Sequence, residues 1–437
     1  MKDAQGHVLS GATDEAIGPY TQAAAAFNSG YGDALGLCDQ ALAAAPAFVM
    51  PHIVKAWMFT LGNDPIFMAR AKVEISITAA MNDREQAHVK ALRFATSGER
   101  AKAVAILDRH LMDYPLDLPA HQAATLLDSF IGRFHLARDR CGRALPAWSK
   151  DTPGYGGVLA FYGMGLEEAG DYTRAEDVSR DAAEREPHSF WPHHTVSHVM
   201  EMTGRPQDGL GWMAAREPLW SAPENVTRVH IWWHRSLFHV ELGQYATALA
   251  LYDGPIMESL RPVGNALCNP SALLWRLDIL GCDVGDRWAD LASKWDGHAD
   301  GKCQVFTDMH AAMAELRSGQ EALAERRLAW MRDTAAGTGE SAAICRDVGL
   351  PLIESLIAFH RGAYQDTVDK LMDIRFDIWR IGGSHAQRDI VAWTLTEAAI
   401  RGGMTKAAHA LAHERLGVRA RSIVNRDFLA RAERMAT

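Results

Sequence analysis

His194, His198 and Glu201 have the spacing of residues on one face of a helix. Residues at i, i+4 and i+7 of a helix point the same way, so the two imidazoles and the carboxylate can act together. Three kinds of site fit them: hydrogen bonds between neighbouring helices, a pocket for a small polar or anionic ligand, and a metal site. The metal site ranks last, because Thr195 stands where the H-E-x-x-H motif has its glutamate, and we assign no metal ligand.

Further histidines and tryptophans lie close to this triplet in the sequence. The histidines cluster between positions 188 and 239, and His234 belongs to the next helix-periodic segment. Packed helices lie roughly 8–10 Å apart, so His194, His198 and His234 can share one pocket. Three tryptophans would frame such a pocket: Trp232, Trp233 and Trp275.

A second segment with possible chemistry is GGSHAQRD, in which two glycines and a serine interrupt the helical pattern. Ser384 can cap a helix that begins near His385, with Asp389 in its first turns. The N–H groups at such a helix start can bind an anion, and Arg388 would strengthen the binding. The alternative, which we favour, is a capped helix in which Arg388 pairs with a carboxylate across the groove.

Regularly spaced glycines define the elements that must position these residues. Each of them closes an apolar, helix-periodic segment, at positions 30, 62, 98, 132, 170, 204, 243, 281, 319, 362 and 403. A glycine suits the left-handed residue that ends many helices, so each one predicts a turn between two helices. GLEEAGDYTRAEDVSRDAAEREP, with its turn at Gly170, is the clearest unit, whereas the units at Gly62, Gly132 and Gly281 match weakly. No segment alternates as a strand would.

Composition limits the classes of protein that fit. The 437 residues carry a net charge of -9, and no run of five like charges occurs, so we expect no nucleic acid as a partner. No apolar stretch approaches the roughly 20 residues that span a bilayer, and the first residues do not form a secretory signal. The six cysteines form no C-x-x-C pair and are expected to be reduced. These features predict a soluble, cytoplasmic protein that does not bind membranes.

Several segments resemble the tetratricopeptide repeat protein 38 family. They are WPHHTVSHVMEMTGR, IWWHRSLFHVELGQY, SALLWRLDILG, FTDMHAAMAELRSGQ and GGSHAQRDIVAWTL, and LSGATDEA near the start of the chain is similar as well. The resemblance runs over nearly the whole chain and implies a tetratricopeptide-like fold. It implies no activity and no catalytic residues.

The resemblance also implies which positions face the inner groove, about 13, 10, 6 and 3 residues before each turn glycine. His230 lies at position thirteen, His52 and His194 at ten, His198 at six and Glu201 at three. His234 and Asp308 lie within one residue of such positions.

These observations predict an all-α fold, an α-α superhelix of about eleven antiparallel helix pairs that forms one repeat domain over residues 1–437 and could curl into a closed or near-closed array. We expect its concave face to bind a small molecule or peptide through eight side chains: His52, His198, Glu201, His230, Trp232, Trp275, His385 and Arg388. The alternative is an enzyme in which His194 or His234 is the general acid or base and Asp308 orients it. The sequence leaves the reaction, the cofactor and the oligomeric state open, a homodimer included.

Overall fold

The computed structural model describes residues 1–77 and 81–435, and helices dominate them. No strand occurs in these ranges, where the only extended pairing is two isolated bridges. The chain divides into two compact units, Met1–Val196 with Arg216–Arg228, and Ser197–Ala215 with Val229–Thr437. Each unit is described by itself.

The first unit consists of helices α1 to α10 and the parts of α11 and α12 that fall within its ranges. Its helices are α1 Asp14–Ser29, α2 Ala34–Ala44, α3 Val49–Leu61, α4 Pro65–Ile77, α5 Asp83–Thr96, α6 Arg100–Asp113, α7 Leu118–Phe130, α8 Leu136–Ala144, α9 Tyr155–Glu168 and α10 Tyr172–Arg185, followed by α11 Phe190–Met202 and α12 Pro206–Trp220, which cross the division between the units.

The second unit contains the remainder of α11 and α12 and all later helices. These are α13 Arg228–Glu241, α14 Tyr245–Leu251, α15 Met257–Ser259, α16 Gly264–Ile279, α17 Arg287–Lys294, α18 Val305–Arg317, α19 Glu321–Ala335, α20 Glu340–Ile344, α21 Leu350–His360, α22 Tyr364–Ile374, α23 His385–Arg401, α24 Thr405–Val418 and α25 Ile423–Arg434. Short 3₁₀ turns lie at Leu145–Ala147 and Ile378–Ile381, and π-helical turns at Tyr252–Ile256 and Cys345–Gly349.

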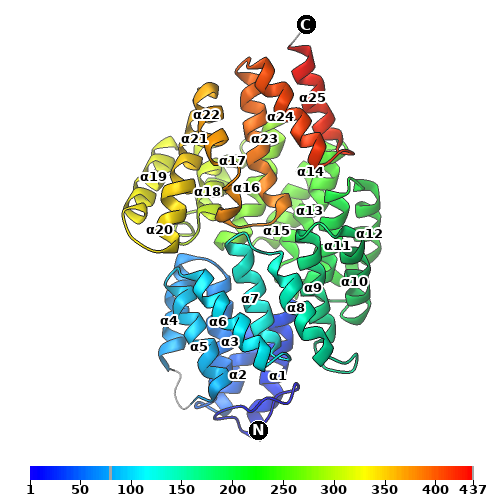
Figure 1. Cartoon of the computed structure of the whole chain (residues 1–437), viewed down its shortest axis with the longest axis vertical. Helices are drawn as coiled ribbons and strands as arrows, with labels where there is room; N and C mark the ends of the chain where they lie inside the picture. The colour runs from blue at the N-terminus through cyan, green and yellow to red at the C-terminus, as the bar shows by residue number, and fades with distance from the viewer. Residues whose placement is uncertain (78–80, 436–437) are drawn as a thin grey trace. The chain divides into compact units, whose positions relative to one another are not determined.

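Consecutive helices pack against each other as antiparallel pairs. In the first unit α1 packs on α2, α3 on α4, α5 on α6 and α9 on α10, and in the second unit α18 packs on α19 and α21 on α22 (Figure 1). Small residues allow close approach: a β-carbon at Gly163 of α9 would lie only 2.2 Å from Ser179 Oγ of α10. Each pair buries its apolar faces against the next pair, which is how repeat proteins build a continuous core.

The turn glycines perform the predicted role. All but one of the predicted positions have a left-handed φ between 66° and 84°, namely 30, 98, 132, 170, 204, 243, 281, 319, 362 and 403. At Gly170 an added β-carbon would meet no atom within 4 Å, so the backbone conformation and not the space requires glycine. The exception is Gly62, whose φ is -63°, because Asn63 beside it takes the left-handed conformation. Asparagine tolerates that conformation better than other residues with a side chain.

The prediction of an all-α fold built from antiparallel helix pairs is confirmed. The single repeat domain and the closed array remain predictions. No helix of the described residues is both long and apolar enough to cross a membrane.

Candidate functional site

Three of the predicted histidines meet in the second unit. His198 lies on α11, and His230 and His234 lie one turn apart on α13. One ring nitrogen of each lies within 4.8 Å of the others, and we call these three residues the histidine cluster. The ring centroids of His198 and His234 are 4.6 Å apart, and those of His230 and His234 are 4.7 Å apart.

Side chains outside the cluster hold two of its imidazoles in place. His230 Nδ1 lies 2.5 Å from Asn269 Oδ1 of α16, and His234 Nδ1 lies 3.3 Å from Glu201 Oε2 of α11. The Trp233 ring stacks on His230 at 5.1 Å between centroids. Burial lowers the pKa of His230 to about 4. Burial, together with the neighbouring histidines and Arg276, lowers the pKa of His234 well below its ordinary value. Both rings are therefore neutral at pH 7.

Glu201 connects the histidine cluster to a group of arginines from the C-terminal helices. Glu201 Oε1 accepts a hydrogen bond from Arg419 at 3.3 Å, and Arg419 also pairs with Asp389. Asp389 accepts two further bonds from Arg415, at 3.0 and 3.1 Å, and one from Trp393 Nε1 at 2.8 Å. Burial raises the pKa of Asp389, but Arg415 and Arg419 outweigh this effect and hold it far below its ordinary value.

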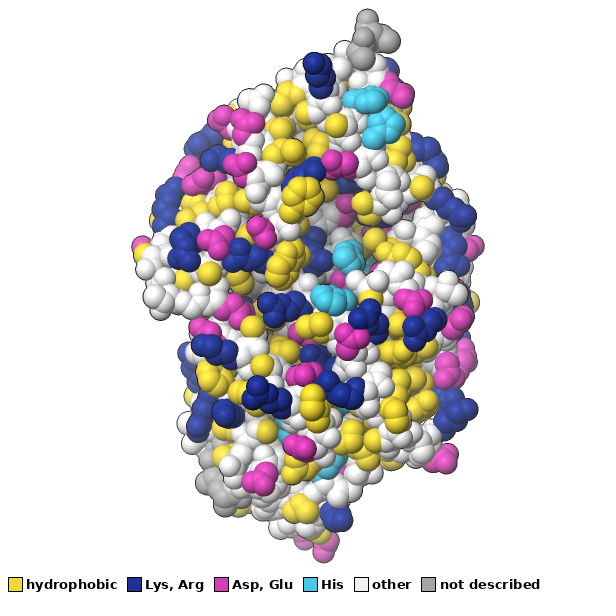
Figure 2. Space-filling model, in the orientation of Figure 1, with side chains coloured by type: hydrophobic (Ala, Val, Ile, Leu, Met, Phe, Trp, Pro, Cys, Tyr) yellow, Lys and Arg dark blue, Asp and Glu magenta, His cyan; other side chains and the backbone are white. Residues whose placement is uncertain are grey.

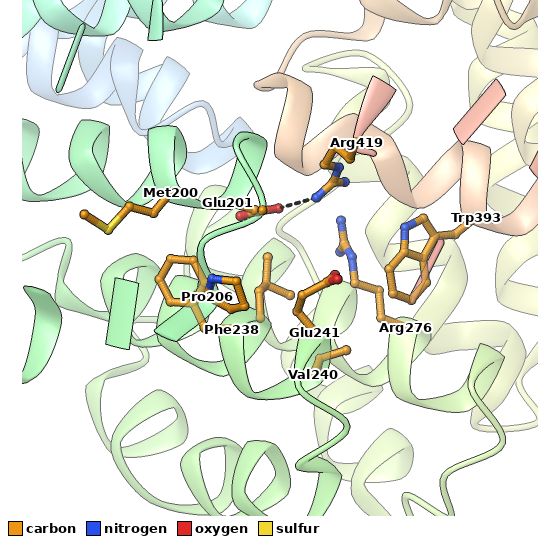
Figure 3. Close-up of a pocket in the computed structure, with 11 residues that line it drawn as sticks. Met200, Glu201, Pro206, Phe238, Val240, Glu241, Arg276, Trp393 and Arg419 are labelled. Carbon is orange, nitrogen blue, oxygen red and sulfur yellow. Dashed lines mark hydrogen bonds and ion pairs between the residues drawn. The ribbon is translucent and has the colours of Figure 1, made fainter. Parts of the chain in front are cut away.

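A cavity adjoins these arginines (Figure 3). Its volume is about 400 Å³ including the space open to solvent, and its polar lining is Glu201, Glu241, Arg276 and Arg419. Its wall includes the aromatic rings of Phe238 and Trp393. We call this space the arginine cavity.

Arg276, on α16, is the least compensated charge of the cavity. Its guanidinium donates to two main-chain carbonyls, Ala272 O at 3.2 Å and Ala386 O at 2.8 Å. It also lies 5.6 Å from the Trp233 ring and 5.7 Å from the Trp393 ring. Figure 3 shows it pointing from α16 toward Glu201 and Arg419, yet no carboxylate of the described residues forms an ion pair with it. Burial lowers the pKa of Arg276 to about 10.

Three further residues were predicted for the site: His194, His52 and Trp232. His194 lies in the first unit, where its ring stacks on Phe190 at 4.8 Å between centroids. His52 Nδ1 lies 2.7 Å from Glu74 Oε2, also in the first unit. Trp232 lies in the second unit with the Arg235 guanidinium 5.2 Å from its ring.

The remaining predicted residues lie in the second unit and form separate contacts. Trp275 Nε1 donates to Thr394 Oγ1 at 2.9 Å. Asp308 accepts from Arg327 at 2.7 Å, and although this charge lowers its pKa, burial raises the pKa of Asp308 to about 6. Asp308 also accepts a hydrogen bond from the Gly301 N–H, and among the described residues it forms no bond to a histidine of the cluster.

The GGSHAQRD segment forms a capped helix start. α23 begins at His385, and Ser384 and Gln387 form a reciprocal capping box. His385 is exposed, while Arg388 is buried and donates to Gly383 O. Asp389, one residue later, forms ion pairs with Arg415 and Arg419.

Sequence reasoning missed three central residues, Arg276, Trp393 and Arg419. Arg276 and Trp393 lie in the segments SALLWRLDILG and GGSHAQRDIVAWTL, where their unusual types on apolar helices were an available signal. Arg419 lies in a loop after α24 and has no local signal. Its role depends on contacts with Glu201 and Asp389, which are remote in the chain.

A second histidine group, in the first unit, has a different character. Asp117 Oδ2 accepts hydrogen bonds from Arg84 at 2.6 Å, His88 at 3.0 Å and His110 at 2.9 Å. His88 Nδ1 in turn accepts from Trp57 Nε1 at 2.8 Å. Burial raises the pKa of Asp117, but Arg84 and the histidines hold it well below its ordinary value. This group is the structural kind of site, in which buried polar atoms satisfy one another.

Comparison with known proteins gives structural similarity only at low sequence identity. No family model matches the chain. The human IFIT1 dimer with PPP-AAAA is 11% identical, with 98% of this chain and 96% of that chain covered and a TM-score of 0.43. The human IFIT1 dimer with m7Gppp-AAAA is 13% identical over the same shares, also with a TM-score of 0.43. The APC/C hetero-tetramer Cut9-Hcn1 is 12% identical, with 96% and 90% covered and a TM-score of 0.35.

The expectation that nucleic acid is excluded as a partner was wrong, because the IFIT1 structures contain PPP-AAAA and m7Gppp-AAAA. The expectation rested on net charge, which describes the whole chain, whereas an anion meets only local side chains. Figure 2 shows basic and acidic side chains intermixed over the face in view, so the net charge of the chain does not describe the charge of any one surface region. The chain is a helical-repeat protein of tetratricopeptide-like fold, built from the hairpins described above.

Proposed function

We propose that the second unit binds a small anionic molecule in the arginine cavity. The observation that carries this proposal is the Arg276 guanidinium, which is buried beside the cavity and has no carboxylate partner among the described residues. A buried charge without a directly paired carboxylate is costly, and a bound anion would add to the more distant negative charges of Asp389 and Glu201. Arg419 lines the same cavity and would be a second donor to the anion.

The rest of the lining limits the chemistry of the ligand. Trp393 and Phe238 offer apolar ring surface, while Glu201 and Glu241 offer carboxylates. The Glu241 carboxylate is anchored by the backbone N–H groups of Ile423 and Val424, and burial raises its pKa. A ligand that carries both an anionic group and a hydroxyl or amino group would satisfy both sets of residues.

Catalysis by the histidine cluster is the second candidate. It is favoured by the contact of His234 with Glu201, a residue that also lines the cavity. General acid–base catalysis is most effective when the pKa of the group lies near the working pH. Because burial lowers the pKa of His230 to about 4 and that of His234 well below its ordinary value, we place binding before catalysis.

Membership of the tetratricopeptide repeat protein 38 family and a cytoplasmic location are further parts of this proposal.

Isothermal titration calorimetry tests the proposal with four probes: pyrophosphate, succinate, ATP and a 5′-triphosphorylated RNA tetranucleotide. The RNA distinguishes a free small molecule from the same phosphate chemistry at the end of a chain. We expect at least one small probe to bind, and Arg276→Met to weaken that binding at least tenfold. The loss of a charge-assisted hydrogen bond corresponds to about 1.5–3 kcal/mol, or roughly tenfold or more.

Arg401→Gln is the matched control. The Arg401 guanidinium also lies over an aromatic ring, Phe359, at 5.3 Å, but it is paired with Glu397 at 2.6 Å and does not line the cavity. Its substitution should leave probe binding unchanged. Equal binding by the parent and Arg276→Met, or no binding of any small probe, would contradict the proposal.

A further inference from the structure

His230 and His234 face each other through their Nε2 atoms, which are 3.2 Å apart. One ring nitrogen of His198 lies within 4.8 Å of a ring nitrogen of each of these two histidines. Whether the contact between His230 and His234 is an ordinary hydrogen bond depends on which ring nitrogens carry hydrogen. The residues that bind the Nδ1 atoms of the two rings, Asn269 and Glu201, determine this.

Asn269 fixes the hydrogen on His230. Its side-chain nitrogen donates to Ala266 O at 2.9 Å, so its oxygen must face His230 Nδ1. A flipped amide would set two oxygens against each other. Because Asn269 Oδ1 can only accept, His230 Nδ1 carries the hydrogen, and Nε2 of the neutral ring has a lone pair.

Glu201 has the same effect on His234. Its Oε2 atom accepts, so His234 Nδ1 donates to it across 3.3 Å and Nε2 again has a lone pair. Two lone pairs then face each other at 3.2 Å, and a metal ion between them would stabilise this arrangement. The outer partners match those of metal-binding histidines, which usually donate their second N–H to a carboxylate or a carbonyl oxygen.

The distances suit a transition metal with nitrogen ligands. Two nitrogens 3.2 Å apart that each lie about 2.0–2.1 Å from one ion subtend an angle of roughly 100°, near the tetrahedral value. Neutral imidazoles suit Zn²⁺, whereas Mg²⁺ and Ca²⁺ prefer oxygen ligands. The first-unit group is unlike this one, because the Nε2 atoms of His88 and His110 both face Asp117, which also binds the Arg84 guanidinium.

We propose that His198, His230 and His234 bind one Zn²⁺ ion, with Asn269 and Glu201 as the outer partners that orient two of the ligands. The three histidines lie on two helices, α11 and α13, so the ion would join the two. This site is independent of anion binding by Arg276.

An exposed histidine pair on α24 must be removed before metal binding is measured. His409 and His413 also have Nε2 atoms 3.2 Å apart and could bind a metal ion weakly at the surface. The parent protein for the experiment is therefore the double variant His409→Ala and His413→Ala. It is dialysed against EDTA, then titrated with Co²⁺ and Zn²⁺, and metal content is measured by mass spectrometry after gel filtration.

We expect one equivalent of metal and the visible absorption of four-coordinate Co²⁺, displaced by Zn²⁺. His234→Ala should abolish both signals, and Asn269→Ala should weaken binding roughly 10–100-fold through the outer partner alone. As a control, His110→Gln in the first unit should leave the stoichiometry at one. If His234→Ala does not fold, the parent and Asn269→Ala still decide the question.

A parent protein that retains no metal, or metal binding that Asn269→Ala leaves unchanged, would overturn the proposal. Anion binding is measured separately in EDTA, so the metal site can fail while the arginine cavity holds. The reverse result, metal binding with no response to anions, is equally distinct.

Discussion

Replacement of Arg276 by methionine should stabilise the protein while it weakens anion binding at least tenfold. Methionine keeps an unbranched apolar stem between the Trp233 and Trp393 rings and removes only the charged end. The two carbonyls that Arg276 contacts, Ala272 O and Ala386 O, lie inside α16 and α23. Their helical N–H donors remain, so the substitution leaves neither carbonyl unsatisfied.

The magnitude follows from the pKa of the guanidinium. Burial lowers the pKa of Arg276 from its ordinary value to about 10. At about 1.4 kcal/mol per pKa unit, the charged form is disfavoured by about 3 kcal/mol in the folded protein. The pKa of this basic group is lowered on folding, so the penalty is fully present at pH 7 and is relieved only as the pH rises above about 10.

The assay is thermal unfolding at pH 7 in ligand-free buffer, and differential scanning calorimetry measures the Tm. After the loss of two hydrogen bonds to carbonyls, we expect a net gain of roughly 1–2 kcal/mol. For a unit of this size, each kcal/mol corresponds to roughly 2–4 °C in Tm. A Tm that falls by several degrees, with anion binding intact, would refute the reasoning and make Arg276 a structural residue. Functional groups are often held at a cost in stability, and the expected pair of results would be such a case.

Three further predictions concern other buried groups. Asp117→Asn should destabilise the first unit by about 3–5 kcal/mol, measured by urea unfolding, because it breaks the buried ion pair with Arg84 and leaves that arginine only Asp3 as a counter-charge. Acid should destabilise the protein at pH values well above the pKa of carboxylates, because three histidines are buried in their neutral form. Burial lowers the pKa of His121 and His230 to about 4 and that of His310 to about 3. The unfolded chain takes up these protons near pH 6.5, so each histidine should reduce the free energy of unfolding by about 1.4 kcal/mol per pH unit between roughly pH 6.5 and 4, and a flat Tm over this range would contradict the burial of these rings. Asp308→Asn should lower the Tm through its lost ion pair but leave probe binding unchanged, and a selective loss of binding would return Asp308 to the site.

The repeat could be predicted because its signals are local. A left-handed residue at a helix end favours glycine wherever the helix lies, so Gly170 and Gly243 identified their turns without knowledge of tertiary contacts. Gly62 shows the limit, since Asn63 took the left-handed role there. The Ser384 cap was predictable for the same reason, because the capping bonds lie within four residues of the helix start.

The site was predictable only in part. His198, Glu201 and His234 lie on helix faces that the repeat pattern orients, and they do meet. Asp308 lies at a similar position on its helix, yet its carboxylate forms an ion pair with Arg327. Whether a polar residue reaches a shared site or pairs locally depends on the partner that the neighbouring helix offers, and helical periodicity does not specify that partner.

The sequence by itself determined the helical hairpin, its turns and the apolar faces, because these depend on backbone conformation and on period along a single segment. Only the tertiary structure decided that Arg276 is left without a carboxylate while Arg419 and Arg415 share Asp389. Charges tens or hundreds of residues apart compete for the same counter-charge over a few ångströms, and electrostatic energy depends on that distance and on burial. Neither this distance nor this burial can be read from the order of the residues.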